Sequence, residues 1–190
     1  QKMKEQIQIN NEQVLDVISG EHLDKFKEQK QKADHFYQTG KYQDAILIYT
    51  NLLTELNDYQ QTQFTASIHY NMALTFKNMK EVTKQEESLI KCLKIDSKYR
   101  KARIQLAKLY MDQQEFISAQ QEWQNISQLS PLSADEQKMK EVCDKKSIDQ
   151  TLQTLKGWGN KLLGKFGMSL DQFQVQKNED GSMNIGMNKK

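Results

Sequence analysis

One stretch of the sequence decides the fold: Ala33-Asp34-His35-Phe36-Tyr37-Gln38-Thr39-Gly40-Lys41-Tyr42-Gln43-Asp44-Ala45-Ile46. Its opening pattern, an alanine followed three residues later by an aromatic residue, recurs as Ala73 with Phe76 and as Ala107 with Tyr110. Ala73 and Ala107 are 34 residues apart, and a fixed period near this length is typical of stacked helix pairs. The sequence therefore predicts an all-α solenoid of three helix-turn-helix repeats.

The spacing between the first two units is longer, because Ala33 and Ala73 are 40 residues apart. The polar run 57–62 can absorb the excess, since surface connections tolerate insertions at small entropic cost. The second unit also departs from the pattern at Gln85, where a second small residue is expected, and at Ser97, where the third unit has a proline. We expect looser packing there and the same fold.

The first unit resembles the consensus of the tetratricopeptide repeat (TPR) family. In that consensus a small residue lets the first helix, helix A, approach the second, helix B. A Gly-Lys-Tyr run then turns the chain, and a second small residue seats helix B. Ala33, Gly40–Tyr42 and Ala45 fill these positions, and the third unit matches at further offsets: Phe116, Ala119, Trp123, Ile126 and Pro131. The resemblance implies a TPR helical solenoid with a concave groove.

We expect four parts along the chain. Residues 1–25 are predicted to form an N-terminal lead-in helix, with apolar residues from Val14 to Ile18 and an interruption near Ser19-Gly20. Residues 26–133 contain the repeats, divided as 26–65, 66–99 and 100–133. Residues 134–167 are predicted to form a long C-terminal capping helix, and residues 168–190 an extended or partly disordered tail.

The capping helix is expected to begin at Ser133, because Ser133 and Glu136 have the spacing of a capping box. Its apolar positions predict one stripe that covers the exposed end of the last repeat; they are Met139, Val142, Cys143, Leu152, Leu155, Trp158, Leu162 and Phe166. As an alternative, residues 158–166 are apolar on one side and carry lysines, as an interfacial membrane helix can. Beyond Gly167, alternating apolar residues around a turn at 178–181 are typical of a short hairpin.

Composition and motifs exclude several classes of function. A formal net charge of +2 gives no long-range field that favours nucleic acid. His22, His35 and His69 share no short spacing, and neither Cys92 nor Cys143 has a companion at metal-ligand spacing. The chain contains no phosphate-binding loop and no nucleophile motif. We therefore expect a protein that is not an enzyme and needs neither metal nor cofactor.

The expected location is the cytoplasm. No run of about 18 apolar residues could span a membrane, and the first residues lack the apolar run of a secretory signal. The chain begins with Gln1, so we expect it to be a fragment whose upstream segment is missing.

The tail carries a narrower resemblance. Leu155-Lys156-Gly157-Trp158-Gly159-Asn160, then Phe166-Gly167-Met168-Ser169 and Phe173-Gln174-Val175, are similar to the C-terminus of the tetratricopeptide repeat protein 1 family. Members of that family are regarded as cytosolic adaptors or co-chaperones. The resemblance implies protein partners, either the C-terminal tails of heat-shock chaperones or GTPases.

The same resemblance implies a peptide-binding groove. Three-repeat co-chaperones commonly hold a C-terminal carboxylate between lysines, asparagines and an arginine on their A helices, through charge-assisted hydrogen bonds. The corresponding positions here are Lys30, Asp34, Asn71, Lys101 and Gln105. Lys30, Asn71 and Lys101 match, whereas Asp34 adds an anion and Gln105 removes a guanidinium. Arg103 is not expected to replace it, because two residues along a helix correspond to a rotation of about 200°.

Three functions from different classes stay open at this point. The first is an adaptor or co-chaperone that grips a peptide segment or C-terminal tail of a partner in the groove. The second is a structural subunit of a large multiprotein assembly, bound through its TPR surface and C-terminal tail. The third, ranked last, is a protein bound to a membrane surface through residues 155–166. Trp158, Leu162 and Phe166 form the candidate second contact surface.

Overall fold

The structure is a computed structural model that describes residues 20–56, 63–177 and 183–187. Three features predicted from the sequence lie outside these residues. They are the apolar run from Val14 to Ile18, the inserted segment 57–62 and the hairpin turn at 178–181.

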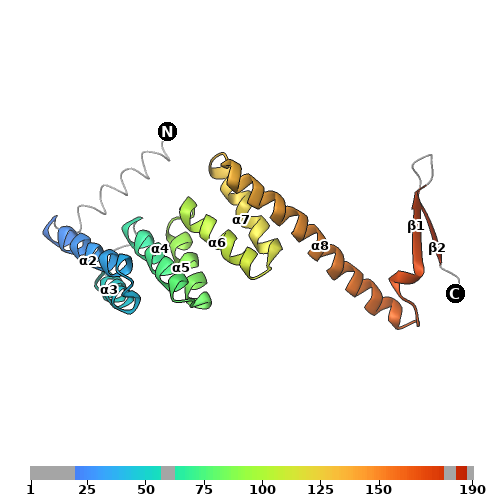
Figure 1. Cartoon of the computed structure of the whole chain (residues 1–190), viewed down its shortest axis with the longest axis horizontal. Helices are drawn as coiled ribbons and strands as arrows, with labels where there is room; N and C mark the ends of the chain where they lie inside the picture. The colour runs from blue at the N-terminus through green and yellow to red at the C-terminus, as the bar shows by residue number, and fades with distance from the viewer. Residues whose placement is uncertain (1–19, 57–62, 178–182, 188–190) are drawn as a thin grey trace, which may run out of the picture.

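Six helices stack as three successive pairs along the chain (Figure 1). The pairs are α2 (Gly20–Gln38) with α3 (Tyr42–Glu55), α4 (Gln63–Asn78) with α5 (Val82–Ile95), and α6 (Arg100–Asp112) with α7 (Phe116–Leu129). A long helix, α8 (Ala134–Gly164), packs on α7 and then extends away from the repeats. The predicted solenoid of three helix-turn-helix repeats with a long C-terminal helix is confirmed.

Each pair is joined by the same tight turn. Gly40 takes a left-handed backbone conformation in the first turn, with φ of 77°, which costs a glycine little because it has no Cβ atom. Lys80 and Gln114 hold the same position in the second and third turns, with φ of 59° and 63°. In each turn the next residue donates its N–H to the carbonyl five residues earlier, which satisfies a carbonyl at the end of helix A. Packing of the two helices therefore imposes the left-handed conformation in this turn, even where the residue is a lysine or a glutamine, for which that conformation is unfavourable.

Small residues lie where the helices of a pair approach each other. Ala33 and Ala45 are fully buried in the first repeat, as are Ala107 and Ala119 in the third. Gln85 takes the position of the second alanine in the middle repeat and is also buried, with 6% of its surface exposed. The longer side chain is thus accommodated inside the second repeat without a change of fold.

The first helix begins earlier than its repeat was predicted to begin. α2 runs without a break from Gly20 to Gln38, so the boundary expected after residue 25 falls inside it. Phe26 is buried and packs in the same apolar cluster as Ala33 and Leu52. The described residues before position 26 therefore belong to helix A of the first repeat.

The start of α8 is fixed by the predicted capping box and by an ion pair. The backbone N–H of Ser133 donates to Glu136, and the N–H of Glu136 donates to the Ser133 hydroxyl, at 2.9 and 3.4 Å. Arg100 on α6 donates to both carboxylate oxygens of Glu136, at 3.0 and 2.6 Å. The Arg100 hydrogen bond and the Ser133 N–H together lower the pKa of Glu136 to about 2. α8 is thereby joined to helix A of the third repeat.

This ion pair predicts a pH dependence of stability. Because the pKa of Glu136 is lower in the folded chain than its ordinary value of 4.5, its stabilising contribution is complete above that value and is lost as pH falls towards 2. Glu136→Gln should lower the free energy of unfolding at pH 7 by about 1–2 kcal/mol. Urea unfolding followed by circular dichroism should show this difference shrinking between pH 5 and pH 2. A difference that stays constant over that range would contradict the assignment.

The single apolar stripe expected along α8 is wrong, because the helix has two apolar faces. Met139 and Cys143 pack against the third repeat. The outer residues Leu152, Leu155, Trp158, Leu162 and Phe166 are between 56% and 75% exposed. A helix turns about 100° per residue, so Leu152 lies roughly 180° around the axis from Cys143. Among the described residues, the hydrogen bond farthest along α8 that still reaches the repeats runs from the Gln150 amide to the carbonyl of Gln114, at 3.2 Å.

The exposure of the outer part of α8 predicts that a leucine there contributes far less to stability than a leucine buried in the repeats, such as Leu52 on α3. Leu162→Asp should change the free energy of unfolding by no more than about 0.5 kcal/mol, because the side chain is exposed. Leu52→Ala removes a fully buried side chain and should cost about 2–5 kcal/mol. Urea unfolding of both variants tests this. Equal losses of unfolding free energy in the two variants would mean that the outer apolar residues of α8 are part of the core.

The C-terminal tail folds back on the end of α8. The side-chain oxygen of Asn160 accepts hydrogen bonds from the Leu170 N–H at 2.6 Å and the Ser169 hydroxyl at 3.3 Å. Leu170 also lies against Gly159, where an added Cβ atom would be 2.4 Å from it. A short helix, η2 (Leu170–Gln172), then leads into strands β1 (Phe173–Lys177) and β2 (Met183–Met187), which pair antiparallel with Val175 opposite Ile185. The predicted hairpin is confirmed.

Candidate peptide-binding groove

The candidate site is formed by rows of polar side chains on the A helices. Residues three, four or seven positions apart share one face of a helix. Lys30, Asp34 and Tyr37 have this spacing on α2, and Asn71 and Asn78 have it on α4. Two hydrogen bonds connect these rows, one from Asn71 to Asp34 at 2.8 Å and one from Asn78 to the Tyr37 hydroxyl at 3.1 Å.

Asp34 is the centre of this arrangement. One carboxylate oxygen accepts from Lys30 at 2.9 Å. The other accepts from the side-chain amide of Asn71, at 2.8 Å, and from the hydroxyl of Tyr49 on α3. The structure therefore brings together three residues predicted from the sequence, Lys30, Asp34 and Asn71. Because these three residues form hydrogen bonds to one another, the site offers the carboxylate of a partner peptide a different surface from the one that the resemblance implied.

The contacts keep Tyr49 in its neutral form. Burial, and then the neighbouring Asp34 carboxylate, raise the pKa of Tyr49 far above its ordinary value, so Tyr49 stays a neutral donor. Lys30 supplies a compensating positive charge, and both members of the ion pair are partly buried. Asp34 thus acts as an internal anion at the position where the resemblance implied an asparagine.

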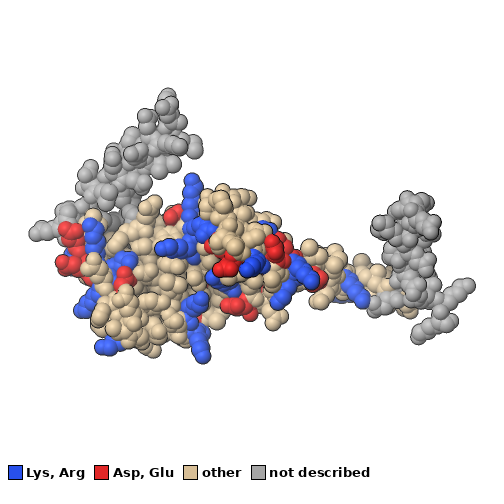
Figure 2. All heavy atoms as spheres, turned by 45° about the horizontal axis from the view of Figure 1, so that its top comes forward, with Lys and Arg blue, Asp and Glu red and all other residues tan. Residues whose placement is uncertain are grey.

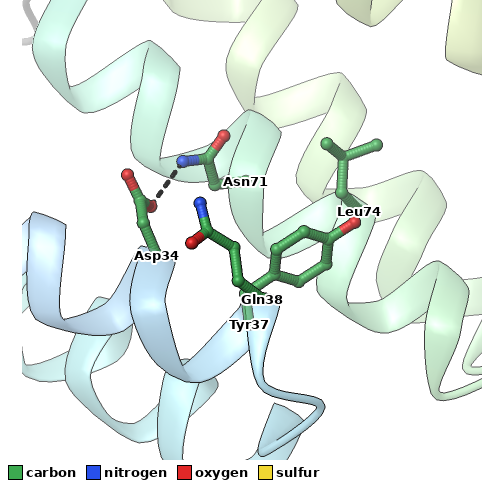
Figure 3. A pocket seen from close by; sticks show the side chains of 5 residues that line it. All are labelled: Asp34, Tyr37, Gln38, Asn71 and Leu74. Carbon is green, nitrogen blue, oxygen red and sulfur yellow. Dashed lines mark hydrogen bonds between the residues drawn. The ribbon is translucent and has the colours of Figure 1, made fainter.

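A hollow opens beside the cluster, between α2 and α4 (Figure 3). It has a volume of about 190 Å³ and is lined by Asp34, Tyr37, Gln38, Asn71 and Leu74. In Figure 3 the amide nitrogen of Asn71 faces Asp34, whereas its oxygen points away. The hollow therefore combines hydrogen-bonding groups with one aliphatic and one aromatic side chain, as sites that hold extended peptides do.

The α6 end of the row differs from the expectation. Gln105 accepts a hydrogen bond from Lys77 of α4 at 3.2 Å. Lys101 is exposed one turn earlier on α6 and has no hydrogen bond or ion pair with the Asp34 cluster among the described residues. Lys77 and Tyr49 were not among the residues predicted from the sequence. The spacing of Leu74 and Lys77, three residues apart on one helix face, was the available signal for Lys77.

Arg103 does not contribute to the groove, as expected. Its guanidinium donates to Glu122 of α7 at 2.7 Å and to the carbonyl of Ser97 at 2.9 Å. It therefore joins the two helices of the third repeat and leaves Gln105 without a neighbouring guanidinium.

The candidate second contact surface is exposed and far from the groove. Trp158 and Leu162 lie on the outer part of α8, and Phe166 lies two residues beyond its end at Gly164. Within the described ranges, no three histidine, cysteine, aspartate or glutamate side chains could hold a metal ion. The buried cysteines Cys92 and Cys143 are free thiols. Among the described helices, none is long and apolar enough to cross a bilayer.

Several solved structures have a similar fold. The C-terminal TPR-containing domain of an FK506-binding protein from Plasmodium falciparum is 21% identical, with a TM-score of 0.55 over 66% of this chain and 90% of that one. The first TPR of Spaghetti (RPAP3), bound to the HSP90 peptide SRMEEVD, is 18% identical, with a TM-score of 0.54 over 64% and 94%. The type III secretion chaperone SycD of Yersinia enterocolitica, in complex with a peptide of the translocator YopD, is 18% identical, with a TM-score of 0.56 over 65% and 95%.

No protein-family model matches the chain, and no curated protein matches it in sequence. At identities of 17–21%, the structural likeness establishes the fold alone. The narrower resemblance of the tail to the tetratricopeptide repeat protein 1 family stays a prediction.

Proposed function

We propose that this chain, which has the tetratricopeptide-repeat fold, is a cytoplasmic, non-enzymatic adaptor that grips an extended peptide segment of a partner protein. The segment would lie across α2, α4 and α6. The observation that carries the proposal is the hollow between α2 and α4, where Asn71 and Gln38 stand beside Leu74 and Tyr37.

The hollow has what an extended peptide requires. Side-chain amides both donate and accept hydrogen bonds, so Gln38 and the outward oxygen of Asn71 can pair with a peptide backbone. Leu74 and Tyr37 offer an apolar surface for one peptide side chain. Peptide complexes of two proteins with the same fold support this mode of binding.

The charges along the groove determine which part of the peptide lies over which helix. Because Lys30 is already paired with Asp34, at 2.9 Å, a terminal carboxylate placed there would meet a compensated ion pair and would gain little attraction from Lys30. Lys77 and Lys101 provide positive charge nearer α6. We therefore propose an uncharged peptide group over α2 and acidic side chains towards α6. An acidic heat-shock tail and a segment of a GTPase are the two proposed kinds of partner.

Peptide binding tests the proposal and the role of Asp34. The probe is the heptapeptide SRMEEVD, labelled at its N-terminus and prepared both as the free acid and as the C-terminal amide. We expect the wild-type chain to bind the amide at least as well as the free acid, by fluorescence anisotropy. Asp34→Asn should tighten binding of the free acid about tenfold, because it releases Lys30 to pair with the terminal carboxylate.

A matched pair of lysine variants locates the binding surface. Lys77→Glu should weaken binding of either peptide by roughly tenfold, because it reverses a charge beside the groove. Lys91→Glu makes the same change on the exposed side of a B helix and should leave binding unchanged. Failure of both peptides to bind, or equal losses in the two variants, would contradict a groove for acidic segments.

A further inference from the structure

The outer part of α8 is a second candidate for a binding surface. We call residues 151–166, which follow the last hydrogen bond to the repeats, the α8 overhang. It extends away from the solenoid in Figure 1. Its apolar side chains are the exposed Leu152, Leu155, Trp158, Leu162 and Phe166. Exposed apolar side chains that form one contiguous patch mark an interaction site more often than a solvated surface.

These side chains form one face of the helix. At about 100° per residue, all five fall within an arc of roughly 120°. Gly159 falls inside the same arc, and there Leu170 of the tail lies against the helix and adds to the apolar surface. The face is therefore continuous from Leu152 to Phe166, and its centre lies about 120° around the axis from Cys143, which packs on the third repeat.

The charged residues of the overhang are all positive. They are Lys156, Lys161 and Lys165, and no aspartate or glutamate lies between positions 151 and 166. All three are exposed. Lys156 lies about 40° beyond one edge of the apolar arc, and Lys165 about 20° beyond the other edge. On the face shown in Figure 2, the outer part of α8 is tan and blue.

The overhang also lacks internal support as a helix. It contains Gly157, Gly159 and Gly164, and glycine is unfavourable in a solvent-exposed helix because it loses much backbone freedom. An added Cβ atom at Gly157 or Gly164 would meet nothing, so packing within the chain does not require either glycine. A surface that buries the apolar face would supply the missing stabilisation.

We propose that the α8 overhang docks on the surface of an anionic lipid bilayer, with its apolar face at the boundary of headgroups and acyl chains. Lysines along both edges of an apolar face suit this location, because their stems can lie along the apolar surface while their ammonium groups reach lipid phosphates. A tryptophan and a phenylalanine on that face are typical of such helices.

Charge argues against a second copy of the chain as the occupant. Two overhangs packed face to face would bring three lysines of one copy close to three of the other. The membrane interpretation ranked last on sequence alone, because the stripe was expected to be buried against the third repeat. The outer part of the stripe is exposed, so this reason for ranking the membrane interpretation last no longer holds.

Vesicle binding by the whole chain tests the proposal. The probe is unilamellar phosphatidylcholine vesicles with and without phosphatidylserine, and binding is measured by flotation. Emission of Trp158 gives a second readout, since Trp158 is 68% exposed whereas Trp123 is fully buried. We expect flotation with a blue shift of emission on phosphatidylserine vesicles, and at least about tenfold weaker binding to phosphatidylcholine alone.

Two sets of variants assign the binding to the overhang. Leu162→Asp should reduce vesicle binding roughly tenfold or more. Leu47→Asp, on α3, makes the same change at a matched exposure of 60% against 64% and should leave binding intact. Lys161→Glu combined with Lys165→Glu should abolish the preference for phosphatidylserine. Circular dichroism confirms that each variant folds.

Three results would overturn the proposal. The first is that the wild-type chain does not bind phosphatidylserine vesicles. The second is that Leu162→Asp still binds them as the wild-type chain does, and the third is that Leu47→Asp loses as much vesicle binding as Leu162→Asp. If sedimentation instead shows a dimer that Leu162→Asp dissociates, the occupant of the overhang is a second copy. If the chain forms neither a dimer nor a complex with vesicles, the overhang is not a membrane-docking surface.

Discussion

The close approach of helices over alanine is the contact on which the rest of the structure depends. Ala33, Ala45, Ala107 and Ala119 are fully buried, and larger side chains at these points would force the helices apart. The distance between α2 and α4 follows from how each pair packs. Asn71 can reach Asp34 at 2.8 Å only because the A helices of neighbouring repeats lie this close. The groove is thus a product of core packing as much as of its own polar residues.

Local sequence patterns were sufficient for most of the fold. The repeat period located the three helix pairs, and Ser133 with Glu136 located the start of α8. The outer half of α8 was mispredicted because two apolar faces on one helix give a run of apolar residues that resembles a single stripe. The rotation of about 180° between Cys143 and Leu152 was present in the sequence and separates the faces. The boundary after residue 25 was misplaced, although the break expected near Ser19-Gly20 agrees with α2 beginning at Gly20.

The sequence indicated which residues of the candidate site lie on one surface, but it did not indicate the hydrogen bonds that they form with one another. The resemblance placed Lys30, Asp34 and Asn71 on one surface, and the structure confirms that they meet. Their mutual hydrogen bonds, and the contribution of Tyr49 from a B helix, depend on tertiary distances that no spacing along one helix provides. Once Asp34 is bound by three partners, its charge is already compensated inside the protein. An incoming peptide then meets a neutral ion pair where the resemblance implied exposed cations.

The length of α8 has a consequence for how the two surfaces of the chain can diverge. Its 31 residues form a rod of about 46 Å, and both the docked face and the overhang belong to it. Each inserted or deleted residue would turn the overhang by about 100° relative to the groove, whereas a step of seven residues would turn it by only about 20°. The helix therefore sets both a distance and an angle between the two surfaces, and even a step of seven residues, which nearly preserves the angle, changes the distance by about 10 Å.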